Sequence, residues 1–179
     1  MMQEIERVLI SEEALQARIQ ELGRELARDY EGKCPVFVGM LKGVILFFAD
    51  MIRATPIRSQ IDLMAVSSYG AGTESTGRIV LKKDVSLDLR GRHVVILEDI
   101  IDSGLTLKYT VEHLKEMEPA SLKICTLLDK PARRTVEVNA DYIGFTIPNE
   151  FVVGYGLDYN DYYRNLPFIG VLKPEVYEH

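Results

Sequence analysis

The feature that most constrains this 179-residue chain is a segment in which an apolar run leads directly into acids, a glycine turn and a helix. Four apolar residues, Val94–Leu97, precede the adjacent carboxylates of Glu98 and Asp99, and the turn Asp102–Gly104 follows. Like charges beside a buried strand lower stability unless a ligand or a metal uses them. In open α/β sheets, ligands bind at the carboxyl ends of the strands. The segment therefore predicts a strand–turn–helix unit with a ligand site at the end of the strand.

The rest of the chain alternates strands with helices, which indicates an α/β fold with a central parallel sheet flanked by helices on both faces. Helical spacing predicts helices over residues 11–26, 43–53 and 105–117. Apolar runs predict strands over residues 35–40, 61–66, 78–83, 93–98, 122–128, 142–145, 152–154 and 168–172, with 78–83 at an edge. Because no repeat or linker interrupts this pattern, we expect a single domain over residues 1–179.

Charge and hydropathy exclude some classes of partner. The chain has 27 acidic and 21 basic residues, a net charge of −6, which argues against extensive contacts with nucleic acid. No run approaches the roughly 20 apolar residues that span a bilayer. The first residues carry acids early and lack a signal-peptide pattern. We therefore expect a cytoplasmic protein with neither nucleic acid nor membrane as a partner.

The turn after the acid pair has the properties of a phosphate site. Backbone N–H groups at a helix N-terminus, together with the hydroxyls of Ser103 and Thr106, can donate to a phosphate. Gly104 allows the backbone to approach closely, and Glu98 and Asp99 can accept hydrogen bonds from sugar hydroxyls. An ordinary helix cap uses the same residue types, so the turn alone does not decide between the two interpretations.

This segment resembles the phosphoribosyl diphosphate (PRPP) motif of the type I phosphoribosyltransferases, and the chain is similar to their bacterial members that act on hypoxanthine and guanine. The resemblance covers nearly the whole chain. It implies the type I phosphoribosyltransferase fold, with a small hood of terminal segments over the base site. It also implies that Asp102 is the catalytic general base. The residues implied to bind the sugar and its phosphate are Glu98, Asp99, Asp102, Ser103, Gly104, Leu105 and Thr106.

Two further blocks carry the resemblance on the phosphate side. By spacing alone, Lys42 is a surface lysine at a helix start, whereas the resemblance implies that Leu41, Lys42 and Gly43 contact pyrophosphate. It also implies that the Leu41–Lys42 peptide is cis in at least some states of the protein. The Gly/Ser/Thr-rich segment after residue 66 is equally compatible with a flexible hairpin connection. The resemblance implies a mobile loop whose Ser68 and Tyr69 close over the reacting centre.

The last block concerns the base. The resemblance assigns Lys130 to the purine 6-oxo group, Phe151 to stacking and the Val152 backbone to the edge of the base. It assigns Asp158 to the base side and to Mg²⁺, with Glu98 and Asp99 as further metal residues, and Arg164 to pyrophosphate. Without it, Phe151 is a core residue, Arg164 a solvated charge and Asp158 a turn former.

The resemblance thus implies transfer of the 5-phosphoribosyl group from PRPP to N9 of hypoxanthine or guanine, with Mg²⁺ as cofactor, in a homodimer or homotetramer. A regulator that senses PRPP would predict a basic surface, which this composition lacks. An enzyme for adenine, orotate or uracil is disfavoured by Lys130 and by the block 151–158. A Rossmann enzyme would require a Gly-x-Gly-x-x-Gly turn after a strand, and none occurs.

Overall fold

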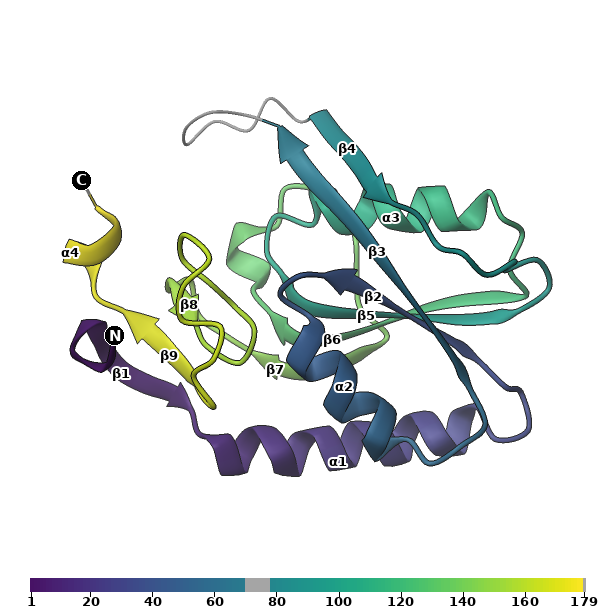
Figure 1. Cartoon of the computed structure of the whole chain (residues 1–179), viewed down its shortest axis with the longest axis horizontal. Coiled ribbons are helices and arrows are strands. Elements are labelled where there is room, and N and C mark those ends of the chain that lie inside the picture. Colours follow the sequence, from purple (N-terminus) through teal and green to yellow (C-terminus); the bar gives the residue numbers. More distant parts are fainter. Residues whose placement is uncertain (70–77, 179) are drawn as a thin grey trace.

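The computed structural model describes residues 1–69 and 78–178, which form two sheets with helices packed on them (Figure 1). The larger sheet has the order β4-β3-β2-β5-β6-β7 and the smaller one the order β1-β9-β8. The strands of the two sheets are β1 (Ile5–Ile10), β2 (Val36–Leu41), β3 (Gln60–Tyr69), β4 (Arg78–Lys83), β5 (His93–Ile101), β6 (Ser121–Asp129), β7 (Tyr142–Thr146), β8 (Val152–Val153) and β9 (Ile169–Leu172). The helices of the described residues are η1 (Met2–Glu4), α1 (Glu12–Asp29), α2 (Ile45–Ala54), α3 (Leu105–Lys115), η2 (Pro131–Arg133) and α4 (Pro174–Tyr177).

The larger sheet confirms the predicted α/β architecture. Neighbouring strands in this sheet are parallel, except that β4 runs antiparallel to β3. β4 lies at one edge of the sheet, as the sequence predicted for residues 78–83. Side chains alternate across β5, so Val95 and Leu97 pack into the core beneath α1 and α2, whereas Val94 and Ile96 pack beneath α3. Figure 1 shows these helices on opposite sides of the sheet.

The predicted helix start at Ser11 is confirmed in detail. The Ser11 hydroxyl accepts a hydrogen bond from the Ala14 N–H at 3.1 Å, and Glu12 and Glu13 occupy the first turn of α1. In the part of the chain that the structure describes, none of the helices combines the length and the apolar character needed to cross a membrane.

The smaller sheet forms the hood that the resemblance implies, and one of its strands was missed. β1 was not predicted, because its residues alternate poorly and are largely exposed. It pairs with β9, so residues 168–172 join the hood rather than the central sheet. Apolar side chains of the hood, including Ile10, Ile169 and Val171, nevertheless pack into the core beneath α1 and α2. The hood is therefore attached to the main sheet through shared packing.

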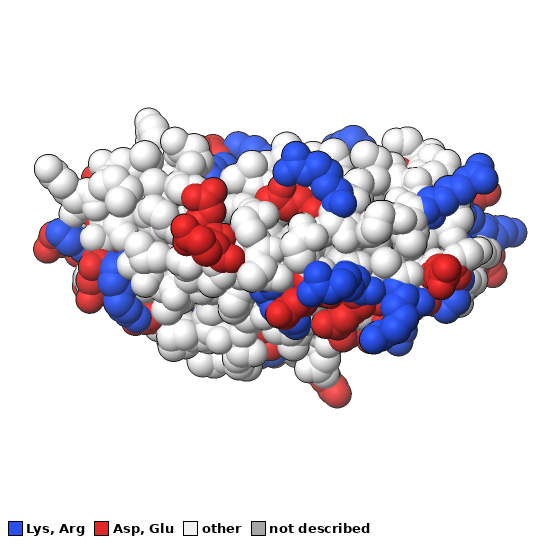
Figure 2. Space-filling view, turned by 90° about the horizontal axis from the view of Figure 1, so that it is seen from below, with Lys and Arg blue, Asp and Glu red and all other residues white. Residues whose placement is uncertain are grey.

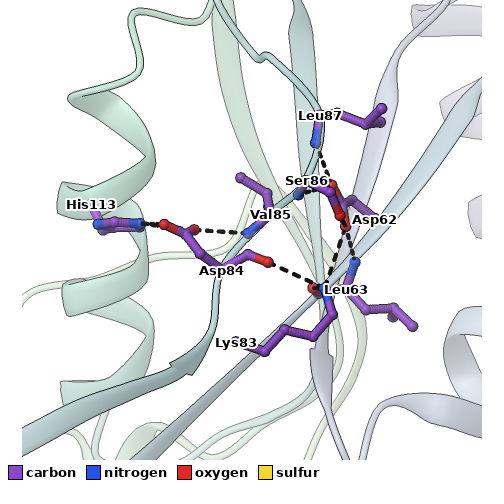
Figure 3. Close-up of polar contacts among 8 residues, drawn as sticks. All are labelled: Asp62, Leu63, Lys83, Asp84, Val85, Ser86, Leu87 and His113. Atoms are coloured by element: carbon purple, nitrogen blue, oxygen red, sulfur yellow. Dashed lines mark hydrogen bonds and ion pairs between the residues drawn. The ribbon is translucent and has the colours of Figure 1, made fainter.

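A buried carboxylate fixes the segment after β4 (Figure 3). Asp62, the third residue of β3, has a side chain that is 6% exposed. It accepts hydrogen bonds from the N–H groups of Leu63, Ser86 and Leu87 at 2.8, 2.6 and 2.9 Å. Burial by itself raises the pKa of Asp62, but these backbone donors and the charge of Lys83 bring it below its ordinary value. The folded chain therefore favours the ionised carboxylate.

We predict that Asp62→Ala lowers the free energy of unfolding by about 1–3 kcal/mol at neutral pH, because buried N–H donors lose their acceptor. The folded-state pKa lies below the unfolded value of about 3.9, so this contribution is complete above that pH. It is lost as the pH falls through the lower folded-state pKa. Urea unfolding at several pH values measures the effect.

The exposed turn residue Glu31 provides a matched control. Glu31→Gln should leave the unfolding free energy within about 0.5 kcal/mol of the starting protein. Equal acid sensitivity in the parent and in Asp62→Ala would contradict the assigned role of Asp62.

Candidate active site

The predicted blocks meet at one edge of the central sheet. Strands β2, β5 and β6 are parallel neighbours, so their carboxyl ends lie side by side. Three predicted blocks follow these ends: the turn 41–43 after β2, the acids and turn 98–106 at the end of β5, and Lys130 after β6. The parallel topology therefore brings together residues that are far apart in the sequence.

The acid pair lies inside β5, because this strand continues to Ile101, beyond its predicted end at Glu98. Glu98 is 8% exposed, and its Oε2 has no hydrogen-bond partner in the described part of the chain. Burial and, secondarily, the charge of Asp99 raise the pKa of Glu98 well above its ordinary value. Burial also raises the pKa of Asp99 to about 6. The folded chain therefore disfavours the ionised form of both carboxyl groups.

The turn after β5 forms a small cavity of about 100 Å³, and its lining residues include Glu98, Asp102, Ser103, Gly104 and Thr106. Gly104 caps α3 with φ +86°, a conformation that glycine adopts readily. A Cβ there would lie 2.6 Å from Val138 Cγ1. The first N–H groups of α3 have no partner within the helix and are available to an anion.

Arg134 supports this turn from behind and was missed by the sequence analysis. Its guanidinium donates to the Asp102 carbonyl at 3.3 Å and to the Val138 carbonyl at 2.6 Å, and it pairs with the Asp129 carboxylate. The side chain is 16% exposed. No local motif marks Arg134, because its partners come from the ends of two different strands and from a later loop.

The turn after β2 lies against the acid pair. The Leu41–Lys42 peptide is cis, as the resemblance implies. A Cβ on Gly43 would lie 1.9 Å from Asp99 Oδ2, and a Cβ on Gly156 would lie 2.0 Å from the Gly43 carbonyl oxygen. Both positions require glycine, because the Asp99 carboxylate packs against Gly43 and the backbones of Gly43 and Gly156 touch. The sequence analysis identified Gly43 but not Gly156.

Asp161 connects the two cations predicted to contact pyrophosphate. Its Oδ1 lies 2.8 Å from Lys42 Nζ and 2.8 Å from an Arg164 nitrogen. Hydrogen bonds from Arg164 and then from Lys42 lower the pKa of Asp161 to about 2. Arg164 also pairs with Asp158 at 3.1 Å and donates to the Gly156 carbonyl at 2.7 Å. The sequence analysis missed Asp161, whose side chain is exposed and resembles a turn former.

A cavity of about 320 Å³ contains the residues predicted to bind the base. Its lining consists of Asp99, Ile100, Asp102, Lys130, Arg133, Phe151, Val152, Leu157 and Asp158. Lys130 is 5% exposed, and burial lowers the pKa of its ammonium group. Asp102 lies 3.8 Å from Lys130 Nζ and 3.3 Å from Arg133 Nε. Arg133 is a second cation at this site that the sequence analysis did not identify.

The residues of the predicted mobile loop are only partly described. Ser68 is exposed in β3 and pairs with Ile79 of β4, and Tyr69 is the last residue of β3. Ser68 lines neither of the two cavities described above. Residues 70–77 of that loop lie outside the described residues.

The acid pair fits a magnesium ion that is completed by other oxygens. In residues 1–69 and 78–178, no group of three or more His, Cys, Asp or Glu side chains is arranged to hold a metal. Mg²⁺ usually binds one or two carboxylates together with waters and substrate phosphates. The unpartnered Glu98 Oε2 beside Asp99 suits this mode. Asp158 already forms an ion pair with Arg164 and accepts a hydrogen bond from the Asp161 N–H.

We predict that Gly43→Ala lowers the affinity for PRPP by about tenfold to a hundredfold, because the new methyl group displaces Asp99 or the turn. Isothermal titration with PRPP measures the affinity. Gly91→Asn is a suitable control, since Gly91 has φ +70° with open space around it and Asn tolerates this conformation. Unchanged PRPP affinity in Gly43→Ala would show that the close approach is not required.

Comparisons with known proteins agree with this geometry. The chain matches the phosphoribosyl transferase domain family over residues 9–160. It is 55% identical to a hypoxanthine-guanine phosphoribosyltransferase of Streptococcus pneumoniae over 174 residues, which cover 97% of each chain. A hypoxanthine phosphoribosyltransferase structure from Staphylococcus aureus superimposes with a TM-score of 0.96 at 49% identity, covering 99% of this chain and 97% of that one.

A further relative is a larger protein. The bifunctional protein TilS/HprT of Listeria monocytogenes is also 55% identical over 97% of this chain, which spans only 27% of that relative's length. The family match and the full-length relatives lead to the same conclusion. The chain belongs to the phosphoribosyltransferase family.

Proposed function

We propose that this protein transfers the 5-phosphoribosyl group from PRPP to N9 of hypoxanthine, and of guanine, and releases pyrophosphate. The observation that carries this proposal is the cavity that combines buried Lys130, the Asp102 carboxylate and the Phe151 ring beside the acid pair. The names of the relatives agree with it. In this arrangement one cavity holds a planar base, and the adjoining turn holds a sugar phosphate.

Purine selection follows from Lys130. Its ammonium group has three donors and no acceptor, so it can bond a 6-oxo group and cannot accept from a 6-amino group. Because Lys130 is buried, the 6-amino group of adenine would face the Lys130 ammonium group, and no water could accept hydrogen bonds from these two donors. The side chains of Phe151, Ile100 and Leu157 supply apolar walls for the faces of the ring.

The remaining groups orient the sugar and the leaving group. The turn 103–106 binds the 5-phosphate, and Glu98 and Asp99 bind the ribose hydroxyls. Lys42 and Arg164 bind the diphosphate, which takes the electron pair as the bond to C1 of the ribose breaks and N9 forms its new bond there. Asp102 accepts the purine proton at N7. Glu98 and Asp99 would hold Mg²⁺, which would supply positive charge for the diphosphate.

The proposal extends to the setting of the enzyme. Residues 1–179 act as one domain, supported by the packing that the hood shares with the sheet. Assembly as a homodimer or homotetramer is supported by the apolar side chains of Ile45 and Leu46, which are 51% and 37% exposed beside the pyrophosphate turn. We place the enzyme in the cytoplasm. Figure 2 shows basic and acidic side chains interspersed on the α1 side, which supports small molecules rather than nucleic acid as partners.

The direct test is an ultraviolet assay with PRPP, Mg²⁺ and one purine at a time. We expect product from hypoxanthine and guanine and none from adenine. Omission of Mg²⁺ should abolish turnover if the acid pair needs the ion. The absence of product with every purine would overturn the proposed function, and PRPP binding without turnover would favour a PRPP-sensing regulator.

We predict that Asp102→Asn lowers kcat by about 10²–10⁴-fold, since the amide keeps the shape of the side chain but cannot take the proton. The KM for PRPP should change little, because the turn that holds the phosphate remains. Steady-state kinetics measure both values. Asp88→Asn, an exposed acid remote from the cavity, is the matched control. Unchanged kcat in Asp102→Asn would remove Asp102 from the chemistry.

We predict that Lys130→Met raises the KM for hypoxanthine at least about tenfold, because the 6-oxo group loses its buried donor. The ratio of kcat/KM for hypoxanthine to that for adenine should fall as well. Competition between the two purines in one assay measures this ratio. Equally strong rejection of adenine by the variant would show that Lys130 does not select the base.

A further inference from the structure

Phe151 lines two cavities. The first is the base cavity of about 320 Å³, and the second has a volume of about 290 Å³. Lys130 and Arg133 also line both cavities, so the two cavities adjoin. Tyr177 lines the second cavity and not the first.

Two tyrosines hold the Phe151 ring. The Tyr177 ring is stacked on it, with centroids 4.6 Å apart and planes 19° apart. The Tyr159 ring is nearly perpendicular to it, with centroids 5.6 Å apart and planes 87° apart. Stacked and edge-to-face pairs are both favourable geometries for aromatic rings. Because Tyr177 covers one face of Phe151, a purine that stacks on this ring must use the other face.

The position of Tyr177 depends on the hood. Pro174 begins α4 directly after β9, and the Lys173 N–H donates to the Glu4 carbonyl at 2.9 Å next to β1. Val176 and Tyr177 pack against a buried cluster that includes Val153, Leu166 and Leu172. Figure 1 shows α4 at the same end of the molecule as β1 and β9 of the hood. Both terminal segments therefore contribute to the support of one ring.

We propose that Tyr177 is a positioning residue for the purine, which fixes the plane of Phe151 before the base arrives. This inference rests on the proposed function, since it assigns the stacking partner of the base. A partly buried aromatic side chain without a second ring on its back retains rotamer freedom, which base binding must then remove. A ring that is already ordered avoids this loss. Tyr177 therefore acts on base affinity through Phe151 without touching the base.

The test compares Tyr177→Leu, which removes the ring, with Tyr177→Phe, which keeps it. We expect Tyr177→Leu to raise the KM for hypoxanthine about three- to tenfold, the range that loss of an aromatic pair produces. The KM for PRPP and kcat should stay within about twofold. Tyr177→Phe should behave as the parent protein. Val176→Ala is the matched control, because it loosens the same short helix without removing a ring from Phe151.

A binding measurement separates positioning from general anchoring. Isothermal titration should show that Tyr177→Leu weakens binding of inosine monophosphate but not of ribose 5-phosphate, which lacks the base. Equal weakening of both ligands, or an unchanged KM for hypoxanthine with a lowered Tm, would show that Tyr177 only anchors the terminal segment. If Tyr177→Leu does not fold, Tyr177→Met tests the same loss of the ring. An inactive parent protein would instead overturn the proposed function.

Discussion

The contact between the Gly43 backbone and the Asp99 carboxylate joins the two halves of the site. Three layers touch here: Asp99 from β5, the turn after β2, and Gly156 from the loop before β9. No side chain fits at Gly43 or Gly156, so the turn lies directly on the Asp99 carboxylate and on the Gly156 backbone. The Gly156 carbonyl also accepts from Arg164, which places that cation beside the same turn. The relative positions of the acid pair, the turn after β2 and Arg164 all depend on this close packing.

The electrostatics of the site follow from the same packing. Because Gly43 covers Asp99 and the strand continues to Ile101, Glu98 and Asp99 are held in a buried strand rather than in a solvated loop. Burial keeps their pKa values raised, and the pair therefore suits a ligand that brings cationic charge or hydroxyl donors. In contrast, Asp161 lies among cations in solvent, and its pKa is lowered to about 2. The pKa of Asp161 thus differs from those of Glu98 and Asp99 because the surroundings of the carboxyl groups differ.

The sequence predicted those parts of the fold and site that local pattern determines. Apolar runs marked the central strands, and Ser11 marked the start of α1. The carboxylates after Leu97 were expected to end their strand, since polar residues usually do, but here a ligand site retains them within it. Strand β1 escaped detection because only its end is buried, and its partner β9 is distant in the sequence. Arg134 and Gly156 act through contacts between remote segments, and no local spacing reports such contacts.

The architecture also divides the two binding tasks between two supports. The residues proposed to bind the sugar and the diphosphate lie mainly at the ends of β2 and β5, within the central sheet and its paired cores. The ring proposed to stack on the base, Phe151, instead precedes β8 of the hood and packs against Tyr159 and Tyr177. Lys130 and Asp102 stand at the boundary, where the end of β6 meets the base cavity. Substitutions in the hood can therefore change how a base is held while the phosphate turn, built on different strands, keeps its geometry.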